Sequence, residues 1–121
     1  EVVETSAANI FFIGRQGDHL EVTTPSGKSG GLEGIVRSWM IELLTATGIR
    51  TEISTVHIDE LPRFDEAFIT SSLRGITPVN RIGRQKLQTS RSGSFFREFE
   101  RLFHAATTRS VGSQVDWNTG A

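Results

Sequence analysis

Residues 35–44 carry the apolar pattern that most restricts how this chain can fold. Two sets of apolar residues recur there at every fourth position: Ile35, Trp39 and Leu43, and beside them Val36, Met40 and Leu44. On an α-helix, with about 3.6 residues per turn, this spacing produces one broad apolar stripe. The sequence therefore predicts an amphipathic helix that ends near Gly48, because glycine readily adopts the left-handed conformation that closes many helices.

A β-hairpin is predicted before this helix. Residues 9–13 are mostly apolar and end at Gly14, and residues 20–23 alternate between apolar and polar in the manner of a strand. A loop rich in glycine and serine, residues 25–31, then leads to the helix.

Three further strand-like segments follow the helix, at residues 51–58, 66–70 and 76–79. A short helical turn is predicted at residues 59–64, and the polar corner 71–75 separates the last two strands. Strands and helices are thus interleaved, which predicts an α/β fold.

A second amphipathic helix is predicted near the carboxyl end, with Ser92 or Ser94 as its cap. Its apolar residues recur at helical spacing: Phe95, Phe99, Leu102, Phe103 and Ala106. Residues 110–121 are mostly polar, with Trp117 as their one aromatic residue. We therefore expect one folded domain over residues 1–109 and an irregular tail over residues 110–121.

The composition of the chain excludes several functional classes. With 121 residues, of which 36% are hydrophobic, we expect one compact domain. Thirteen basic and fourteen acidic residues give a net charge of -1, which disfavours nucleic acids and anionic membranes as partners. The chain has no cysteine, so disulfides and thiolate chemistry are excluded. With no apolar run of bilayer length and no signal-peptide pattern, we expect a soluble, cytoplasmic protein.

No metal site is expected. The three histidines are far apart in the sequence and show no helical pairing: His19, His57 and His104. Four acidic residues surround a turn: Asp59, Glu60, Asp65 and Glu66. Such a cluster is more often a solvated face or a helix-start charge than a catalytic pair.

Five short motifs, each common by itself, occur together in one order and spacing. The pattern Glu-x-Ser-x-x-Asn-Ile-Phe begins at Glu4, and residues 22–24 read Val-Thr-Thr. Residues 32–37 read Leu-Glu-Gly-Ile-Val-Arg, residues 65–72 read Asp-Glu-Ala-Phe-Ile-Thr-Ser-Ser, and residues 75–79 read Gly-Ile-Thr-Pro-Val. Taken together, these motifs resemble the class IV aminotransferase family.

The resemblance implies a fold, a cofactor and a reaction. The fold would be the C-terminal domain of fold-type IV pyridoxal-phosphate enzymes, with a mixed β-sheet or pseudo-barrel and two main helices. The intact parent protein would be a homodimer that uses pyridoxal 5'-phosphate. It would transfer an amino group between a branched-chain or D-amino acid and a 2-oxo acid. Two alternatives stay open: 4-amino-4-deoxychorismate lyase, which the corner 71–75 also suits, and a non-catalytic half-module that pairs with a lysine-bearing chain.

The resemblance also assigns cofactor contacts to this chain. Glu4 matches the carboxylate that keeps the pyridine nitrogen protonated, although an isolated glutamate would usually be a solvated strand end. Leu32 matches the leucine that packs against the pyridine ring. The backbone amides of Ile35 and Val36, in a helix start opened by Gly34, match those that hold the cofactor phosphate. The alternative for this segment is a helix whose first turn faces water.

The corner between the last two strands is assigned to the phosphate and the substrate. Ser72 is expected to donate its hydroxyl to the phosphate, and Ser71, Ser72 and Leu73 to receive the substrate carboxylate. The alternative is a pair of turn serines that satisfy local backbone groups. Arg74 suits an anionic substrate group and solvent equally well.

The family's catalytic lysine precedes the motif that begins at Glu4, and no lysine of this chain matches it. Lys28 lies in the glycine-rich loop and Lys86 in a late polar connection. We therefore expect no catalytic residue in this chain. The lysine would come from a missing N-terminal domain or from a partner chain, and Glu1 would follow earlier residues of the same functional unit.

Overall fold

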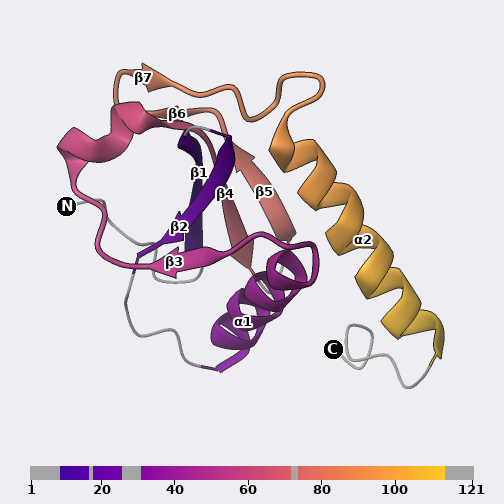
Figure 1. Cartoon of the computed structure of the whole chain (residues 1–121). Coiled ribbons are helices and arrows are strands. Elements are labelled where there is room, and N and C mark those ends of the chain that lie inside the picture. The colour runs from indigo at the N-terminus through magenta and orange to yellow at the C-terminus, as the bar shows by residue number, and fades with distance from the viewer. Residues whose placement is uncertain (1–8, 17, 26–30, 72–73, 114–121) are drawn as a thin grey trace.

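The computed structural model of the chain describes residues 9–16, 18–25, 31–71 and 74–113 (Figure 1). Its elements follow in this order: β1 (Asn9–Gln16), β2 (His19–Thr24), α1 (Gly31–Ala46), β3 (Thr51–Ile53), the 3₁₀-helix η1 (Ile58–Arg63), β4 (Phe64–Ser71), β5 (Gly75–Val79), β6 (Arg81–Ile82), β7 (Gln85–Lys86) and α2 (Phe95–Ser113).

Five of the strands form one mixed sheet in the order β3-β2-β1-β4-β5. β3 runs parallel to β2, whereas β1 pairs antiparallel with both β2 and β4, and β5 pairs antiparallel with β4. The predicted hairpin before the first helix and the predicted strand pair around the corner 71–75 are both confirmed. The prediction of an α/β fold with a mixed sheet and two main helices is also confirmed.

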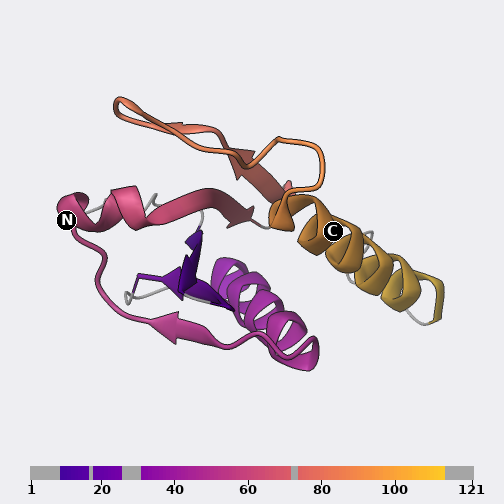
Figure 2. The same cartoon turned by 45° about the horizontal axis from the view of Figure 1, so that its top comes forward.

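The two helices cover one face of this sheet and lie side by side in both views (Figures 1 and 2). Phe11 of β1 and Phe68 of β4 stack beneath them, with ring centroids 5.0 Å apart. The core on this face consists of Phe11, Ile13, Val22, Val36, Met40, Leu44, Phe68, Phe96, Phe99 and Phe103. The apolar stripes of both predicted helices are therefore buried, as their spacing indicated.

A second, smaller core lies on the other side of the sheet. Its buried residues are Ile10, Phe12, Val56, Leu61, Phe64 and Ala67. Leu61 comes from η1, and Ile82 of the β6–β7 hairpin packs against the same cluster. β3 is shorter than the predicted strand 51–58. After the Ser54 amide donates to the Thr24 carbonyl, the chain leaves the sheet and buries Val56 in this second core.

Chain direction brings several segments to one end of the sheet. α1 connects β2 to β3, two parallel strands, so it runs back along the sheet in the opposite direction. Gly48 and Ile49, just beyond α1, accordingly lie against His19 at the start of β2. The first turn of α1 is therefore at the end where β2 finishes, at Thr24. We call this the Thr24 end of the sheet.

β1 and β5 begin, and β4 finishes, at the Thr24 end. The Thr24 hydroxyl donates to the Ile10 carbonyl at 2.7 Å. Next to Ile10, Asn9 pairs with Thr70 of β4, and Ser71 pairs with Gly75 of β5. The corner between β4 and β5 and the start of α1 thus share one end of the sheet.

The helix ends differ in part from the predicted ones. α1 begins at Gly31, three residues before Gly34, because residues 32 and 33 are both good helix formers. It ends as predicted: Gly48 has a φ of 87° and the Ile49 amide donates to the Leu44 carbonyl at 2.9 Å.

α2 begins directly after one of its two predicted cap residues and extends beyond the predicted domain boundary. The Arg97 amide donates to the Ser94 hydroxyl at 3.2 Å, so Ser94 is the cap. The helix runs to Ser113, four residues beyond the boundary at residue 109. Residues 110–113 are therefore helical and not part of an irregular tail, and residues 114–121 lie outside the described residues.

Gly14 allows a backbone approach that no other residue would permit. It lies where the pairing of β1 with β4 shifts register, and a Cβ placed there would be 2.6 Å from the Arg63 carbonyl oxygen. We expect Gly14→Ala to lower the free energy of unfolding by about 1–3 kcal/mol, measured by urea denaturation. Gly48→Asn is the control, because no atom lies within 4 Å of an added Cβ and asparagine tolerates positive φ. A Gly14→Ala variant as stable as the parent would contradict this account of the bulge.

Candidate functional site

The first turn of α1 is the part of the Thr24 end best suited to an anion. The first amides of an α-helix have no partner within the helix and carry partial positive charge. Because α1 begins at Gly31, these amides lie at residues 31–33. The amides of Ile35 and Val36 are in the second turn, where helical pairing directs them to the carbonyls of residues 31 and 32. The predicted binding of phosphate by these two amides assumes a helix that begins at Gly34. This role of Ile35 and Val36 stays a prediction.

The other predicted site residues are placed unevenly. Gly34 is half-buried, Ile35 is 60% exposed, and Val36 is buried in the core against the sheet. Only the backbone of Val36 is therefore available to a ligand. Leu32 lies in the first turn of α1. Three predicted residues lie outside the described residues: Glu4, Ser72 and Leu73.

Ser71 is the last residue of β4 and takes part in a local hydrogen bond. Its Oγ accepts from the Arg74 amide at 3.1 Å, which is the turn interaction given above as the alternative for this serine. The serine hydroxyl can still donate its proton to a ligand. The Arg74 side chain is exposed.

Among the described residues, four buried side-chain groups have no hydrogen-bond partner: those of Thr23, Arg37, Thr51 and Thr70. Of these, Arg37 lies on α1 and Thr70 directly precedes the corner 71–75. Thr70 is completely buried, and it shares a sheet face with Phe68, beneath the helices; its Oγ1 is unpartnered. Arg37, in the second turn of α1, donates through Nη2 to the Pro25 carbonyl at 3.0 Å, but its Nε is unpartnered. Buried polar groups usually have partners, so such donors point to a missing polar ligand. Arg37 is cationic and lies on the helix whose first turn carries unpaired amides, so both features favour an anion over a cation.

Glu66 has a structural role in attaching α2 to the sheet. Of the two alternatives given for the acidic cluster, the solvated face is wrong for Glu66, because its residue exposure is 1%. The helix-start charge describes it correctly, although the helix is α2 and not the nearby turn. The two carboxylate oxygens of Glu66 accept the amides of Phe95 and Phe96, at 2.9 and 2.7 Å, in the first turn of α2. The available signal was position: in strand β4, Glu66 shares the face of Phe68, which is apolar.

The surroundings of Glu66 change its acidity. Burial raises the pKa of the Glu66 carboxyl above its ordinary value of 4.5, because desolvation outweighs the hydrogen bonds from Phe95 and Phe96 and the charge of Arg91, which act in the opposite direction.

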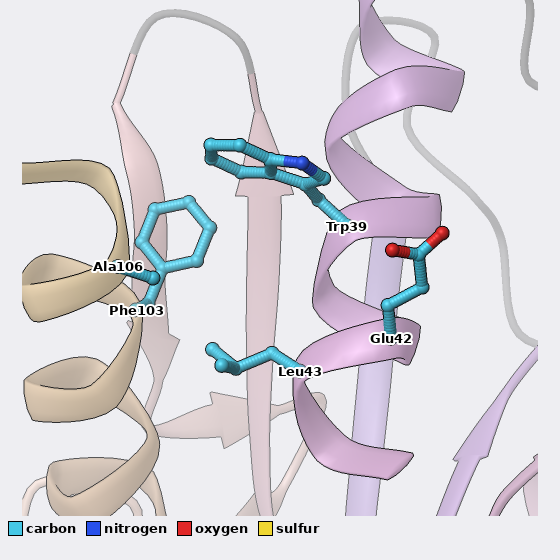
Figure 3. Close-up of a pocket in the computed structure, with 5 residues that line it drawn as sticks. All are labelled: Trp39, Glu42, Leu43, Phe103 and Ala106. Atoms are coloured by element: carbon cyan, nitrogen blue, oxygen red, sulfur yellow. The ribbon is translucent and has the colours of Figure 1, made fainter. Parts of the chain in front are cut away.

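Two surface hollows lie apart from the predicted site residues. The first, of about 280 Å³, lies between the two helices and is lined by Trp39, Glu42, Leu43, Phe103 and Ala106 (Figure 3). The second, of about 650 Å³, lies beside the start of β2 and includes Asp18, Glu21 and Arg50. The first is apolar except for Glu42, and the second is at the opposite end of the sheet from Thr24.

The part of the chain that the structure describes contains neither a metal-binding cluster nor a membrane-spanning helix. No group of three or more histidine, aspartate or glutamate side chains is arranged to hold a metal ion there. The same residues include no helix that is both long and apolar enough to cross a membrane.

Comparison with protein families identifies the chain. Residues 1–82 match the model of the family described as amino-transferase class IV. The chain belongs to the class IV aminotransferases. A probable branched-chain-amino-acid aminotransferase of Thermotoga maritima is 35% identical over 98 residues, which cover 81% of this chain and 32% of the relative. An aminodeoxychorismate lyase of Vibrio harveyi is 30% identical over 81 residues, covering 67% of this chain and 28% of the relative.

Solved structures of class IV aminotransferases share the fold. A putative branched-chain amino acid aminotransferase from Thermotoga maritima superposes with a TM-score of 0.70 at 30% identity, covering 86% of this chain and 36% of that one. An aminotransferase from Brucella abortus bound to the cofactor PLP gives a TM-score of 0.67 at 29% identity, covering 86% and 35%. The chain therefore spans about a third of the length of these relatives.

The raised pKa of Glu66 predicts how stability changes with pH. The unfolded chain ionises Glu66 near pH 4.5, whereas the folded chain ionises it at a higher pH. The stability that Glu66 contributes is thus fully present below pH 4.5 and declines as the pH rises through the folded pKa. We therefore expect the free energy of unfolding of the parent to exceed that of Glu66→Gln by less as the pH rises from 4.5 to neutrality, measured by urea unfolding.

The neighbouring carboxylate provides the control for this experiment. Glu66→Gln should be less stable than the parent at low pH by about 1–3 kcal/mol, because glutamine leaves one of the two helix amides without an acceptor. Asp65→Asn changes an exposed carboxylate and should show neither effect. A difference between parent and Glu66→Gln that grows with pH would contradict the direction of the pKa shift.

Proposed function

We propose that this chain is the C-terminal, cofactor-binding part of a pyridoxal-phosphate-dependent aminotransferase. The reaction moves an amino group between an amino acid of branched-chain or D-amino-acid type and a 2-oxo acid. The observation that carries the proposal is the family match over residues 1–82, which includes both the start of α1 and the corner between β4 and β5. The branched-chain substrate class is supported by the name of the Thermotoga maritima relative.

Residues at the Thr24 end would hold the cofactor. The unpaired amides in the first turn of α1 would face the phosphate, with the Ser72 hydroxyl as a further donor. Leu32 would pack against the pyridine ring, and Glu4 would hold a proton on the ring nitrogen. When bound, the cofactor supplies an electron sink for charge at the substrate α-carbon.

The corner between β4 and β5 would orient the substrate. Ser71, Ser72 and Leu73 would receive its carboxylate, which places the α-carbon at a constant position relative to the cofactor. Ser71 lies at the start of this corner, at the same end of the sheet as the first turn of α1. A carboxylate and a phosphate could therefore be held by neighbouring segments of the chain.

The base that moves the α-proton would come from outside this chain. The family's lysine has no match here: Lys86 lies in β7, on the small two-stranded sheet, and Lys28 is outside the described residues. A general base is needed for transamination. We propose that an N-terminal domain or a lysine-bearing partner chain provides it, within a cytoplasmic homodimer.

4-Amino-4-deoxychorismate lyase is the second candidate. It is supported by the Vibrio harveyi lyase, which is 30% identical. The two activities differ in their products. A protein that joins this chain to a lysine-bearing domain should need a 2-oxo acid as amino acceptor if it is an aminotransferase, and should release pyruvate from aminodeoxychorismate if it is the lyase.

The absence of a matching lysine gives a direct chemical prediction. When the 121-residue chain is mixed with pyridoxal phosphate and reduced with borohydride, neither Lys28 nor Lys86 should become labelled stoichiometrically. Peptide mapping by mass spectrometry measures this outcome. Stoichiometric labelling of one of these lysines, together with turnover of an amino acid, would overturn the assignment of the base to another segment.

The buried hydroxyl of Thr70 gives a second prediction, in which stability and binding change in opposite directions. Thr70→Val removes an unpartnered hydroxyl, so the free energy of unfolding should stay equal or rise. Binding of inorganic phosphate, followed by amide NMR shifts, should weaken by about tenfold or more, because a hydrogen bond to a charged group contributes about 1.5–3 kcal/mol.

Thr23 is the matched control for Thr70. Its hydroxyl is also buried and unpartnered, but it pairs with Phe12 in the sheet and lies on the face of the second core. Thr23→Val should therefore affect stability in the same direction and leave phosphate binding unchanged. Equal phosphate affinities for the parent and Thr70→Val would exclude Thr70 as a phosphate contact.

A further inference from the structure

Phe103 of α2 lies between α1 and the first residue of β5. Its ring centroid is 6.2 Å from that of Trp39, with the two rings nearly perpendicular at 81°. A Cβ added to Gly75 would lie 3.1 Å from Cε2 of Phe103, tighter than ordinary van der Waals contact. Figure 3 shows the Phe103 ring projecting from α2 toward Trp39, in front of the strands of the corner. Phe103 therefore contacts the corner from the helix side of the sheet.

Gly75 connects this contact to the conformation of the corner. Its φ of 72° lies in a region that L residues rarely adopt, and it pairs with Ser71 across the end of the β4–β5 hairpin. The Arg74 amide, next to Gly75, donates to Ser71. A shift of Gly75 would therefore move both described ends of the corner.

The position of Phe103 depends on how α2 docks on the sheet. The first turn of α2 is attached to β4 by the two hydrogen bonds from the Phe95 and Phe96 amides to the buried Glu66 carboxylate. Phe99 packs further along on Phe68, with ring centroids 6.1 Å apart. Phe103 follows one turn later and is 8% exposed. α2 is thus held at its start and in its middle, which places Phe103 beside Gly75.

We propose that Phe103 is a positioning residue that holds the described ends of the corner between β4 and β5, at Ser71 and Gly75, in the positions that suit a bound anion. This inference rests on the proposed function for the location of the anion. Phe103 supports Gly75 from behind, so binding of an anion at the corner and docking of α2 stabilise each other. The coupling is reciprocal, because two linked equilibria change each other's free energy by the same amount.

A double-mutant cycle on the 121-residue chain tests the contact itself. Phosphate affinity is measured from amide NMR shifts of Ser71, Arg74 and Gly75 for the parent, Phe103→Leu, Gly75→Ala and the double variant. Each single change should weaken binding by about fivefold or more. In the double variant the shorter leucine makes room for the alanine methyl group, so its loss should be smaller than the product of the single losses.

Phe99→Leu is the matched control, because it makes the same chemical change one turn earlier in α2. The Phe99 ring packs on Phe68 and Phe103 supplies the three atoms nearest to an added Gly75 Cβ. Phe99→Leu should lower the free energy of unfolding in urea to a similar extent as Phe103→Leu and leave phosphate affinity unchanged.

The outcomes separate the positioning role from the proposed anion site. Suppose that phosphate shifts the amide signals of Ser71, Arg74 and Gly75 in the parent. If phosphate affinity then falls equally in Phe99→Leu and Phe103→Leu, the positioning role is wrong and the site stands. The same conclusion follows if the losses of affinity in the single variants multiply in the double variant. If phosphate does not shift the corner amides of the parent at all, both the site and the positioning role are wrong.

Discussion

The buried carboxylate of Glu66 joins β4, an interior strand of the sheet, to the first turn of α2. A helix start carries unpaired amides, and the two oxygens of Glu66 accept two of them, although desolvation outweighs this effect and raises the pKa of the carboxyl. This attachment decides where α2 lies on the sheet. The aromatic core beneath the helix and the contact of Phe103 with Gly75 both depend on it. The hydrogen bonds of Glu66 therefore help to place the side chain that contacts the proposed binding corner from the helix side of the sheet.

The Thr24 end of the sheet combines three properties that suit an anionic ligand. The crossover from β2 through α1 to β3 directs the first turn of α1 to this end, and the β4–β5 hairpin presents its corner there. Thr70 Oγ1 and Arg37 Nε add buried donors that have no partner among the described residues. Because such donors are costly in a folded chain, they are expected where a ligand completes the network. The family relationship names a cofactor whose phosphate has the required charge.

Much of the fold could be predicted from local patterns. The four-residue spacing around Met40 specified α1, because it reports which side of the helix is buried. Strand-like segments on either side of the polar corner 71–75 indicated β4 and β5. The start of α1 was harder to predict, because helix boundaries depend on competing backbone partners. The helix begins at Gly31 and not at Gly34. The site residues Glu4, Ser72 and Leu73 stay predictions that rest on the order of motifs along the chain.

By itself, the sequence determined the family, the α/β class and the residues expected to meet the cofactor, because short motifs at constant spacing reflect local backbone requirements. It did not determine the role of Glu66, whose partners Phe95 and Phe96 are about thirty positions further along the chain. It also did not reveal that the Thr70 hydroxyl has no partner in the described part of the chain, or that Phe103 touches Gly75. These properties depend on contacts between distant segments, and only the packing of α2 against the sheet brings those segments together.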